Sequence, residues 1–479
     1  MSQERPIRLH AGPWSLEFER WTGWLRNICL GDDLVLRAAY VAARGEDWRT
    51  FRFHTITHHV CQEQNGFQAS WTSECEELGF RWTMECRADS QSLNIVYQGR
   101  GTREFKTRRT GMCLLHPHEQ QGQPIRILHP DGSHRDATFP STIAPDHPFT
   151  EIVGFQLPLK SGIEVTAKLD GEIFETEDQR NWTDASFKTY CRPQNRPAPY
   201  EVQPEQVIQH AVSLDYRGDV VTSTPATTTH LSLKDTAWKI PMLGTQHDSE
   251  VDGFDFVLCQ DPDSKVWRTI GGHPDTVFSL DRSSLDFIRG QFYYGLGENF
   301  VNVNTRQPDM EQFDGIGFGV NPQIHAFDDR SVMENIHAQS DVVKSALEIS
   351  QTKPVFVGPI HLDDDRLSQP IGMAWFAASF ATLASSGANA LSFFEARHFN
   401  GPLDELYQSL REFREEEITL MTSTDPYRAI GFRLHSAERQ QDFFVNMTPY
   451  LEEIAFEGQR LTLDPYEVKI MSMSERTKQ

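Results

Sequence analysis

The 479-residue chain has few cysteines, a deficit of positive charge and no long apolar run. Its seven cysteines are scattered without a Cys-x-x-Cys pair, so we expect free thiols rather than a zinc ribbon or a disulfide framework. A formal net charge of −23 opposes binding to nucleic acid or to an anionic membrane surface, because both need clustered Lys and Arg. No stretch reaches the roughly 18 apolar residues of a membrane span, and the first residues lack the apolar core of a signal peptide. We therefore expect a cytoplasmic protein.

The composition that is present is that of a globular protein with large cores. Hydrophobic residues make up 38% of the chain and charged residues 24%, which argues against a mainly disordered protein. Aromatic residues make up 11%; such side chains fill cores and also line carbohydrate clefts. The length is enough for two or three domains.

Residues 1–232 consist of short runs in which apolar and polar residues alternate, for example SLEFERW, FRWTMEC and IEVTAKL. Turn residues separate these runs, and no long helical period intervenes. Many short strands of this kind predict an N-terminal β-sandwich domain.

The pattern changes at Phe292. From there, strand-like runs such as PVFVGPIHL and ANALSFFEA alternate with helical stretches such as IGMAWFAASFATLASSG. This alternation predicts parallel βα units within residues 233–420. Residues 421–479 return to strand-like runs, and we expect them to form a short C-terminal antiparallel β domain.

One polar stretch carries a resemblance to a known family. The run EIFETEDQRNWTDASFKTYCRP, residues 172–193, resembles the signature of D-apionate lactonases over about fourteen consecutive, mostly polar positions. The run NPQIHAFDDRSVMENIHAQ, residues 321–339, is similar to a second segment of that family. The resemblance covers residues 1–232 and 292–479, whereas residues 236–291 match nothing in the family pattern.

The resemblance implies a sugar-lactone hydrolase that opens D-apionolactone to D-apionate in apiose breakdown, with a small-molecule lactone as partner and no cofactor. It also implies a TIM-type barrel behind the first domain, so the predicted fold class is multidomain α+β. Residues 236–291 are too few for the first three βα units, which need roughly 30 residues each. We therefore expect a truncated or irregular barrel. Either residues 236–291 pack as irregular strands over the gap, or a second subunit of a homo-oligomer covers it, and the cleft is wider and wetter than in longer relatives.

Lactone hydrolysis needs a general base and donors for an oxyanion, and barrels place such groups where their strands end. Glu395 ends the apolar run that contains Phe393 and Phe394, whose rings should raise its pKa and suit it to acid or base catalysis. In the family pattern this strand is the seventh, where many barrel glycosidases keep a catalytic Glu. The alternative is an ion pair with Arg397 at the end of a strand.

His325 is the second predicted catalytic residue. It ends the run that begins at Gly315 and precedes Asp328 and Asp329, and a carboxylate beside a histidine orients it and makes it more basic. The alternative is a loop histidine beside a helix that Asp329 or Ser331 caps.

Asn302 stands where the family carries a glutamate, so the two-carboxylate arrangement of glycoside hydrolysis is lost. Four residues are predicted to bind substrate: Asn302, Asn304, Gln323 and Asp328. The signature itself is unusually polar, and we expect a network that buries against the barrel, either as structural glue or in contact with substrate. Its polar members are Glu177, Asp178, Arg180, Asn181, Trp182, Asp184 and Lys188.

Two histidine pairs are considered as metal ligands: His58 with His59, and His116 with His118. Neither pair has a third His, Cys, Asp or Glu at the sequence spacing of a known metal site, so we expect no bound metal. Two other functions stay open. A non-catalytic paralogue that binds a sugar acid is favoured by the missing barrel length and by Asn302. A glycoside-hydrolase-like enzyme is suggested by Glu395.

Overall fold

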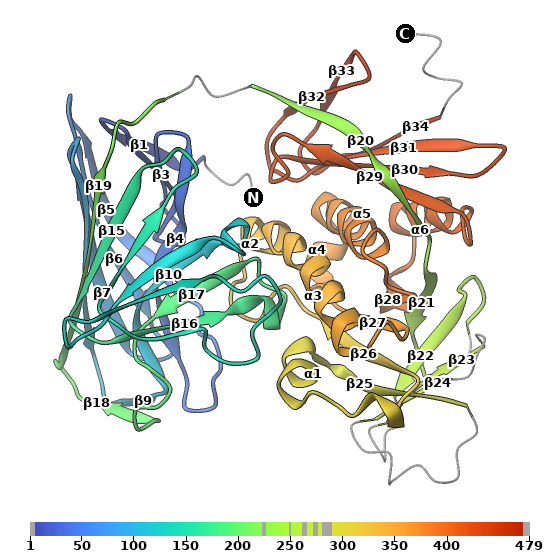
Figure 1. Ribbon diagram of the computed structural model, residues 1–479, viewed down its shortest axis with the longest axis horizontal. Coiled ribbons are helices and arrows are strands. Elements are labelled where there is room, and N and C mark those ends of the chain that lie inside the picture. The colour runs from blue at the N-terminus through green and yellow to red at the C-terminus, as the bar shows by residue number, and fades with distance from the viewer. Residues whose placement is uncertain are drawn as a thin grey trace. The chain divides into compact units, whose positions relative to one another are not determined.

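The computed structural model describes residues 5–222, 227–248, 251–260, 266–271, 276–279 and 290–472, apart from the side chains of residues 296–298. The chain forms two compact units (Figure 1). The first contains Met1–Gln179 and Ser186–Pro225, and the second contains Arg180–Ala185 and Ala226–Gln479. Among the helices of the described residues, none combines the length and the apolar character that a membrane crossing needs.

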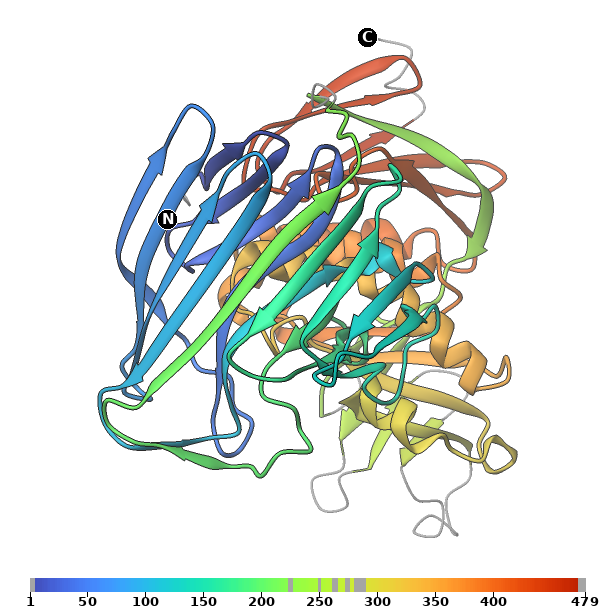
Figure 2. The same ribbon diagram turned by 60° about the vertical axis from the view of Figure 1, so that its left-hand side comes forward.

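The first unit is built from two large sheets (Figure 2). The eight-stranded sheet has the order β1 (Ile7–Ala11), β2 (Trp14–Glu19), β3 (Trp24–Leu30), β4 (Asp33–Arg44), β10 (Arg109–Pro117), β17 (Ser186–Tyr190), β16 (Phe174–Asp178), β13 (Phe149–Ile152). The nine-stranded sheet has the order β12 (His134–Thr138), β11 (Pro124–Leu128), β14 (Gly154–Pro158), β15 (Glu164–Asp170), β19 (Val207–Arg217), β8 (Ser92–Gly101), β7 (Phe80–Ala88), β6 (Phe67–Cys75), β5 (His54–Gln62). A small pair joins β9 (Phe105–Thr107) to β18 (Tyr200–Val202).

Alternation of apolar and polar residues explains these sheets. Along β6, β7 and β8 every second side chain is buried, so one face of the strands is apolar. The buried faces of both sheets contribute to one hydrophobic core, in which Trp14, Phe18, Phe80 and Phe155 are among the largest fully buried side chains. The predicted β structure of this part of the chain is confirmed. By contrast, β4, β10 and β17 are buried on both faces.

The second unit contains a closed barrel of eight strands. In order these are β21 (Met242–Gln246), β22 (Phe256–Gln260), β23 (Trp267–Ile270), β24 (Thr276–Ser279), β25 (Gln291–Asn299), β26 (Gly315–Val320), β27 (Val355–Ile360) and β28 (Ala390–Glu395). β28 pairs with β21 and closes the ring. Neighbouring strands are parallel except at β23, which runs antiparallel to both β22 and β24.

The short segment before the βα units therefore closes the barrel within one chain. Of residues 236–291, positions 249–250, 261–265, 272–275 and 280–289 lie outside the described part. The remainder supplies β21 to β24, and no α-helix occurs among the described residues between β21 and β25. The prediction of irregular strands over the gap is confirmed, and no second subunit is needed to close the ring.

From β25 onward, strands alternate with helices, as the sequence predicts. The helices are α1 (Phe300–Arg306), α2 (Asp329–Glu334), α3 (Ile336–Ile349), α4 (Asp364–Leu367), α5 (Pro370–Ala384) and α6 (Pro402–Arg411). Helix α5 is apolar on all sides and almost wholly buried, as such helices are. Its Phe376 packs on Phe393 of β28 at 4.8 Å between ring centroids, and its Phe380 on Phe432 at 6.0 Å.

A seven-stranded sheet covers the other side of α5 (Figure 1). Its order is β33 (Gln459–Leu463), β32 (Glu452–Phe456), β20 (Thr228–Lys239), β29 (Glu417–Ser423), β30 (Ala429–His435), β31 (Gln440–Asn446), β34 (Val468–Ser472). Strand β20 precedes the barrel in sequence and pairs parallel with β32. The sheet is therefore mixed, although the strands from β29 to β34 pair antiparallel with one another. The parallel pairing with β20 joins distant segments and leaves no local signal, and the C-terminal antiparallel domain over residues 421–479 stays a prediction.

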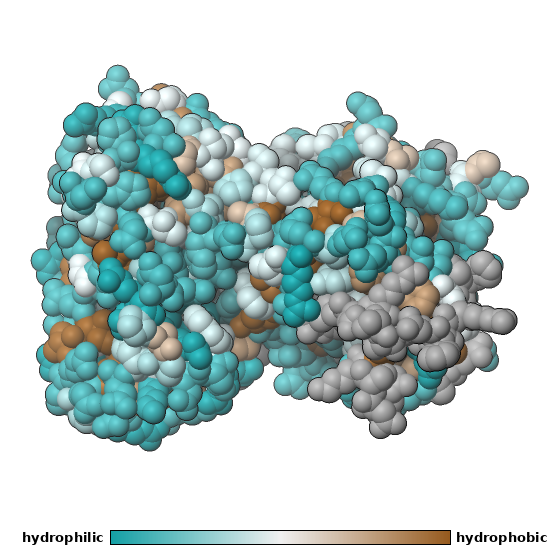
Figure 3. Space-filling model, turned by 60° about the horizontal axis from the view of Figure 1, so that its bottom comes forward, coloured by the Kyte–Doolittle hydropathy of each residue, from teal (hydrophilic) through white to brown (hydrophobic). Residues whose placement is uncertain are grey.

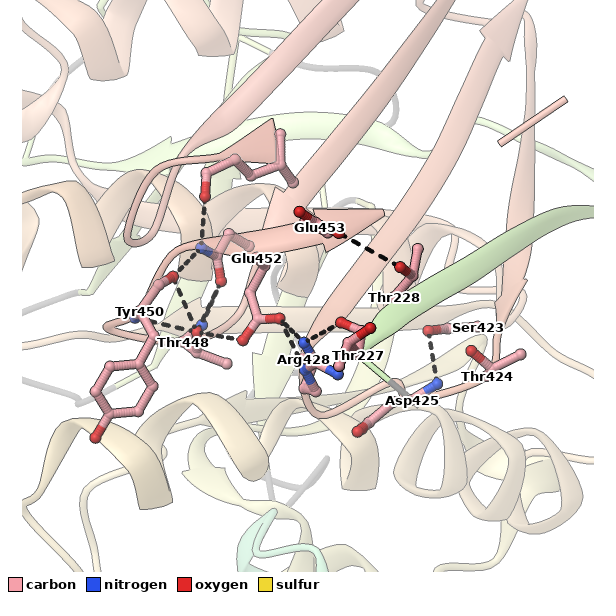
Figure 4. Close-up of polar contacts among 12 residues, drawn as sticks. Thr227, Thr228, Ser423, Thr424, Asp425, Arg428, Thr448, Tyr450, Glu452 and Glu453 are labelled. Carbon is pink, nitrogen blue, oxygen red and sulfur yellow. Dashed lines mark hydrogen bonds and ion pairs between the residues drawn. The ribbon is translucent and has the colours of Figure 1, made fainter. Parts of the chain in front are cut away.

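An ion pair between half-buried Arg428 and buried Glu452 links strands of this sheet (Figure 4). Glu452 on β32 is 4% exposed, and its carboxylate accepts a hydrogen bond from Arg428 Nε at 2.7 Å and one from the Thr448 hydroxyl at 3.1 Å. Arg428 also donates to the carbonyl of Thr227 at 2.9 Å. The pair therefore links β32 to the residue that precedes β20.

We expect Glu452→Ala to lower the free energy of unfolding by about 2 kcal/mol, because it removes charge-assisted hydrogen bonds and leaves half-buried Arg428 and Thr448 without their carboxylate partner. Glu453→Ala, at the next position on the exposed face of β32, is the matched control and should change it by less than about 0.5 kcal/mol. Urea denaturation measures the free energy of unfolding of both variants. Equal losses in the two variants would show that the Arg428–Glu452 pair does not stabilise the sheet.

Candidate active site

Polar side chains gather where four neighbouring barrel strands end, and we call this end the barrel mouth. The strands are β26, β27, β28 and β21, which are consecutive around the ring. The mouth residues are Gln323 and His325 after β26, His361, Asp363 and Asp364 after β27, Glu395, Arg397 and His398 at and after β28, and Gln246 on β21. This is the end at which barrel enzymes place their active sites.

Glu395 lies at the mouth as an exposed, ionised carboxylate. It ends β28, the eighth barrel strand rather than the seventh, and pairs in register with Gln246. Arg397 Nε donates to its Oε2 at 2.7 Å, and this bond lowers the Glu395 pKa, with the Arg397 charge acting in the same direction. The predicted rise is wrong, because Phe393 and Phe394 pack on α5 and leave the carboxylate 53% exposed. The ion pair with Arg397, the alternative interpretation, is present.

Two glutamines at the mouth carry buried amide groups. Gln246 and Gln323 are each 7% exposed. The Gln323 Oε1 accepts the backbone N–H of Asp363 at 2.9 Å, which fixes the orientation of its amide. Within the described part of the chain, neither Nε2 has a hydrogen-bond partner. Buried amide donors without a partner are suited to a ligand oxygen.

His361 and His398 complete this part of the mouth. Desolvation lowers the pKa of His361, and the charge of Glu395 acts in the opposite direction. His398 Nε2 lies 3.1 Å from an oxygen of Asp364, which also pairs with Arg397 at 3.1 Å. The sequence prediction missed these residues; their only signal is their position directly after the strands in GPIHL and FFEARH.

His325 is paired with a carboxylate from the signature segment. Its Nδ1 forms a hydrogen bond with Asp184 Oδ2, and the other oxygen of Asp184 accepts from Asn335 Nδ2 at 2.7 Å. The edge of the Trp182 ring packs at 5.7 Å between centroids. Asp184 is thus a partner of His325 that the sequence did not suggest.

The two aspartates after His325 have structural partners. Asp328 is the N-cap of α2, because its side chain accepts the backbone N–H of Ser331 at 2.9 Å. Asp329 begins the helix and accepts from Arg366 Nε at 2.9 Å. The predicted cap at Asp329 or Ser331 is therefore wrong by one residue or more.

The middle of the signature belongs to the barrel unit. Arg180 forms a buried ion pair with Asp341 of α3 at 3.2 Å, and Asn181 accepts a hydrogen bond from Asn304 Nδ2 at 2.8 Å. For this segment the predicted network that buries against the barrel is confirmed. Its hydrogen bonds hold Asp184 beside His325.

Asn302 and Asn304 lie on α1, whereas the sequence suggested a strand. The run FVNVN is rich in β-branched residues, but Phe300 and Val303 share one buried helical face, so tertiary packing overrides the local preference. Asn304 is buried and bonded to Asn181, while Asn302 is half-buried.

No group of three or more His, Cys, Asp or Glu side chains within the described ranges could hold a metal ion. His116, one of the histidines weighed above, is buried in the first unit, where its Nε2 bonds the Thr189 hydroxyl at 2.8 Å. Burial lowers its pKa to about 3.

Arg397→Gln should raise the Glu395 pKa, because it removes the bond that lowers it. Glu395 would then become protonated at a higher pH as acid is added, and the acid limb of any activity that needs its charge should move to higher pH. Asp364→Asn is a control of opposite sign, because the Asp364 charge raises the Glu395 pKa. Carbon-13 NMR of labelled glutamate measures both shifts, and shifts of the same sign would contradict the assignment.

A closed βα barrel with acid, base and amide groups at its mouth has the arrangement of a barrel enzyme. Two family models match the chain: the D-apionate lactonase N-terminal domain over residues 1–219 and the D-apionate lactonase TIM barrel domain over residues 294–363. A D-apionate lactonase from Brucella anthropi is 24% identical, over 75% of this chain and 73% of the relative. The chain belongs to the D-apionate lactonase family.

Solved structures resemble the chain only distantly. A GH36 α-galactosidase from Geobacillus stearothermophilus is 10% identical, with a TM-score of 0.33 over 98% of this chain and 99% of that one. A putative aldose 1-epimerase from Escherichia coli K12 is 10% identical, with a TM-score of 0.33 over 44% of this chain and 98% of that one. Similarity at this level supports no conclusion about the substrate.

Proposed function

We propose that the chain is a hydrolase that opens a sugar lactone of the D-apionolactone type to its sugar acid at the barrel mouth. The observation that carries the proposal is the His325–Asp184 pair at the end of β26. The family signature supplies the carboxylate, and the second family segment supplies the histidine. A histidine oriented by a buried carboxylate is a recurring arrangement for proton transfer in hydrolysis.

Asp184 sets the proton position on His325. Its carboxylate favours a proton on Nδ1, so Nε2 carries the lone pair and acts as the base. Nε2 takes a proton from water while the water oxygen bonds to the lactone carbonyl carbon. The tetrahedral intermediate then breaks its bond to the ring oxygen, which receives that proton and becomes a hydroxyl group. The new carboxylic acid loses its proton to solvent, so one water is consumed and one carboxylate is formed.

The other mouth residues bind the substrate in this proposal. The amide groups of Gln246 and Gln323 donate to the oxyanion or to sugar hydroxyls, since their N–H groups need a partner. Glu395 stays ionised and accepts hydrogen bonds from a sugar hydroxyl or from the attacking water. Asn304 bonds Asn181 and Asp328 caps α2, and substrate binding by these two residues stays a prediction. The role of Asn302 stays a prediction.

A pH-indicator assay tests the function against a panel of aldonolactones that includes D-apionolactone, with aryl glycosides in parallel. We expect acid release above the spontaneous rate for one or more lactones and none from the glycosides. Glycoside cleavage alone would favour the glycoside hydrolase alternative. Saturable binding of the sugar acids without turnover would favour the non-catalytic paralogue. The cytoplasmic location and the role in apiose breakdown stay predictions.

A further inference from the structure

Two arginines face each other on the eight-stranded sheet of the first unit. Arg44 ends β4 and Arg109 begins β10, and the antiparallel register places them directly opposite. They are 4% and 3% exposed, so two like charges are buried side by side. Directly opposite positions bring side chains to within about 5.5 Å at the backbone, where like charges repel.

Several guanidinium nitrogens of this pair have no hydrogen-bond partner in the described part of the chain. Arg44 Nη1 donates to the Thr50 hydroxyl at 2.6 Å, but its Nη2 has no hydrogen-bond partner among the described residues. Arg109 lacks a partner for both Nε and Nη2. Its guanidinium carbon lies 3.2 Å from the centroid of the Tyr190 ring. Stacking of this kind occupies the face of the guanidinium and leaves its N–H edge for another group.

A third cation shares the same face of the sheet. Lys188 and Tyr190 on β17 lie opposite Leu115 and Cys113 of β10, which point to the same side as Arg109 because side chains alternate along a strand. Lys188 is 1% exposed, and burial lowers its pKa. The charges of Arg44 and Arg109 act in the same direction.

Two carboxylates lie near these cations, and one of them pairs with Lys188. Glu175 accepts the Tyr190 hydroxyl at 2.6 Å and the backbone N–H of Gln194 at 2.7 Å. Glu177 lies 3.8 Å from Lys188 Nζ. The cluster therefore holds three cations and two carboxylates, and the unpartnered nitrogens all belong to the arginines.

We propose that Arg44, Arg109 and Lys188 form a buried binding site for a small oxyanion, a carboxylate or a phosphate group. Buried charges without partners are costly, and guanidinium edges fit the two oxygens of such groups. The cover over the site is the exposed turn between Gly45 and Thr50, whose Trp48 ring lies 5.4 Å from the Arg109 guanidinium. Binding requires this turn to move. All three residues belong to the first unit, and the proposal does not depend on the proposed lactonase activity.

Thermal unfolding with added anions tests the proposal. The probes are inorganic phosphate and D-gluconate, each titrated at ionic strength held constant with sodium chloride. We expect a saturable rise in Tm of about 5 °C at roughly 100 times Kd for one probe or both. A saturable rise in Tm with only one of the two probes also supports the site. It shows whether the site prefers a phosphate group or a carboxylate. No response to either overturns it.

Two variants separate binding from general charge effects. Arg109→Met should abolish the response, whereas Arg108→Met should keep it. Arg108 is the matched control, because it is the adjacent arginine and lies 5.2 Å from the same Trp48 ring, but its Nε is bonded to the carbonyl of Glu46 at 2.5 Å.

The anion-free buffer gives a second readout. There, Arg109→Met should be as stable as the wild type or more so, because it removes one of two uncompensated like charges. A variant that loses stability equally with and without the anions would show that Arg109 serves only to pack on Tyr190, and the proposal would fail.

Discussion

Replacing His325 with alanine is expected to lower kcat for lactone hydrolysis by about 10²- to 10⁴-fold, with a smaller effect on KM. The reason is that the buried carboxylate of Asp184 orients this imidazole at the barrel mouth. The pH–rate profile should also lose one ionisation. Stopped assays from pH 5 to 9 measure both effects.

Two further variants sharpen this result. Asp184→Asn should give a comparable loss, because an amide no longer favours the reactive tautomer of His325. His435→Ala, on β30 of the seven-stranded sheet, is the matched control and should retain wild-type kcat. An unchanged pH profile in the His325 variant would remove this residue from the mechanism.

Glu395→Gln is expected to abolish most hydrolysis, with a loss of about 10²- to 10⁴-fold, while the fold is retained. The substitution keeps the size of the side chain and removes the charge that Arg397 holds in place. An amide at this position cannot replace an ionised acceptor for a substrate hydroxyl or for water. Asp364→Asn, which removes the other partner of Arg397, should cost less than about tenfold. Near wild-type turnover in Glu395→Gln would make Glu395 a structural residue only.

Local patterns predicted much of the fold. Alternation along β6 to β8 is visible in the sequence because one face of each strand is buried. The βα units after Phe292 are visible because helices and strands have different periods. The reversal of β23 and the pairing of β20 with β32 were not predictable, because both depend on contacts between distant segments. The proposed domain boundaries at residues 232 and 420 stay predictions.

The sequence predicted only those residues of the candidate site that lie at or just after the end of an apolar run. Glu395 and His325 were chosen because each ends an apolar run. Glu395 is the last residue of β28, and Gln323 and His325 follow β26. Gln246 was missed because it lies in the segment that matched no family pattern. The pairing of His325 with Asp184 spans 141 positions in the sequence and leaves no local signal.

The irregular half of the barrel bears on the cleft that the sequence predicts. Strands β22 to β24 form a meander in which β23 is reversed, so the described residues there lack the loops that βα units place at the mouth. The predicted wider and wetter cleft, with weak activity on a small lactone, stays a prediction. A lower kcat/KM than that of longer family members on D-apionolactone would agree with it.

The most direct test of the account compares wild type and His325→Asn on D-apionolactone in a pH-stat, with circular dichroism to confirm that both are folded. The account predicts that the wild type releases acid well above the spontaneous rate and yields D-apionate, while the variant falls close to the spontaneous rate. Equal rates for the two proteins, or a wild type no faster than buffer, would contradict it.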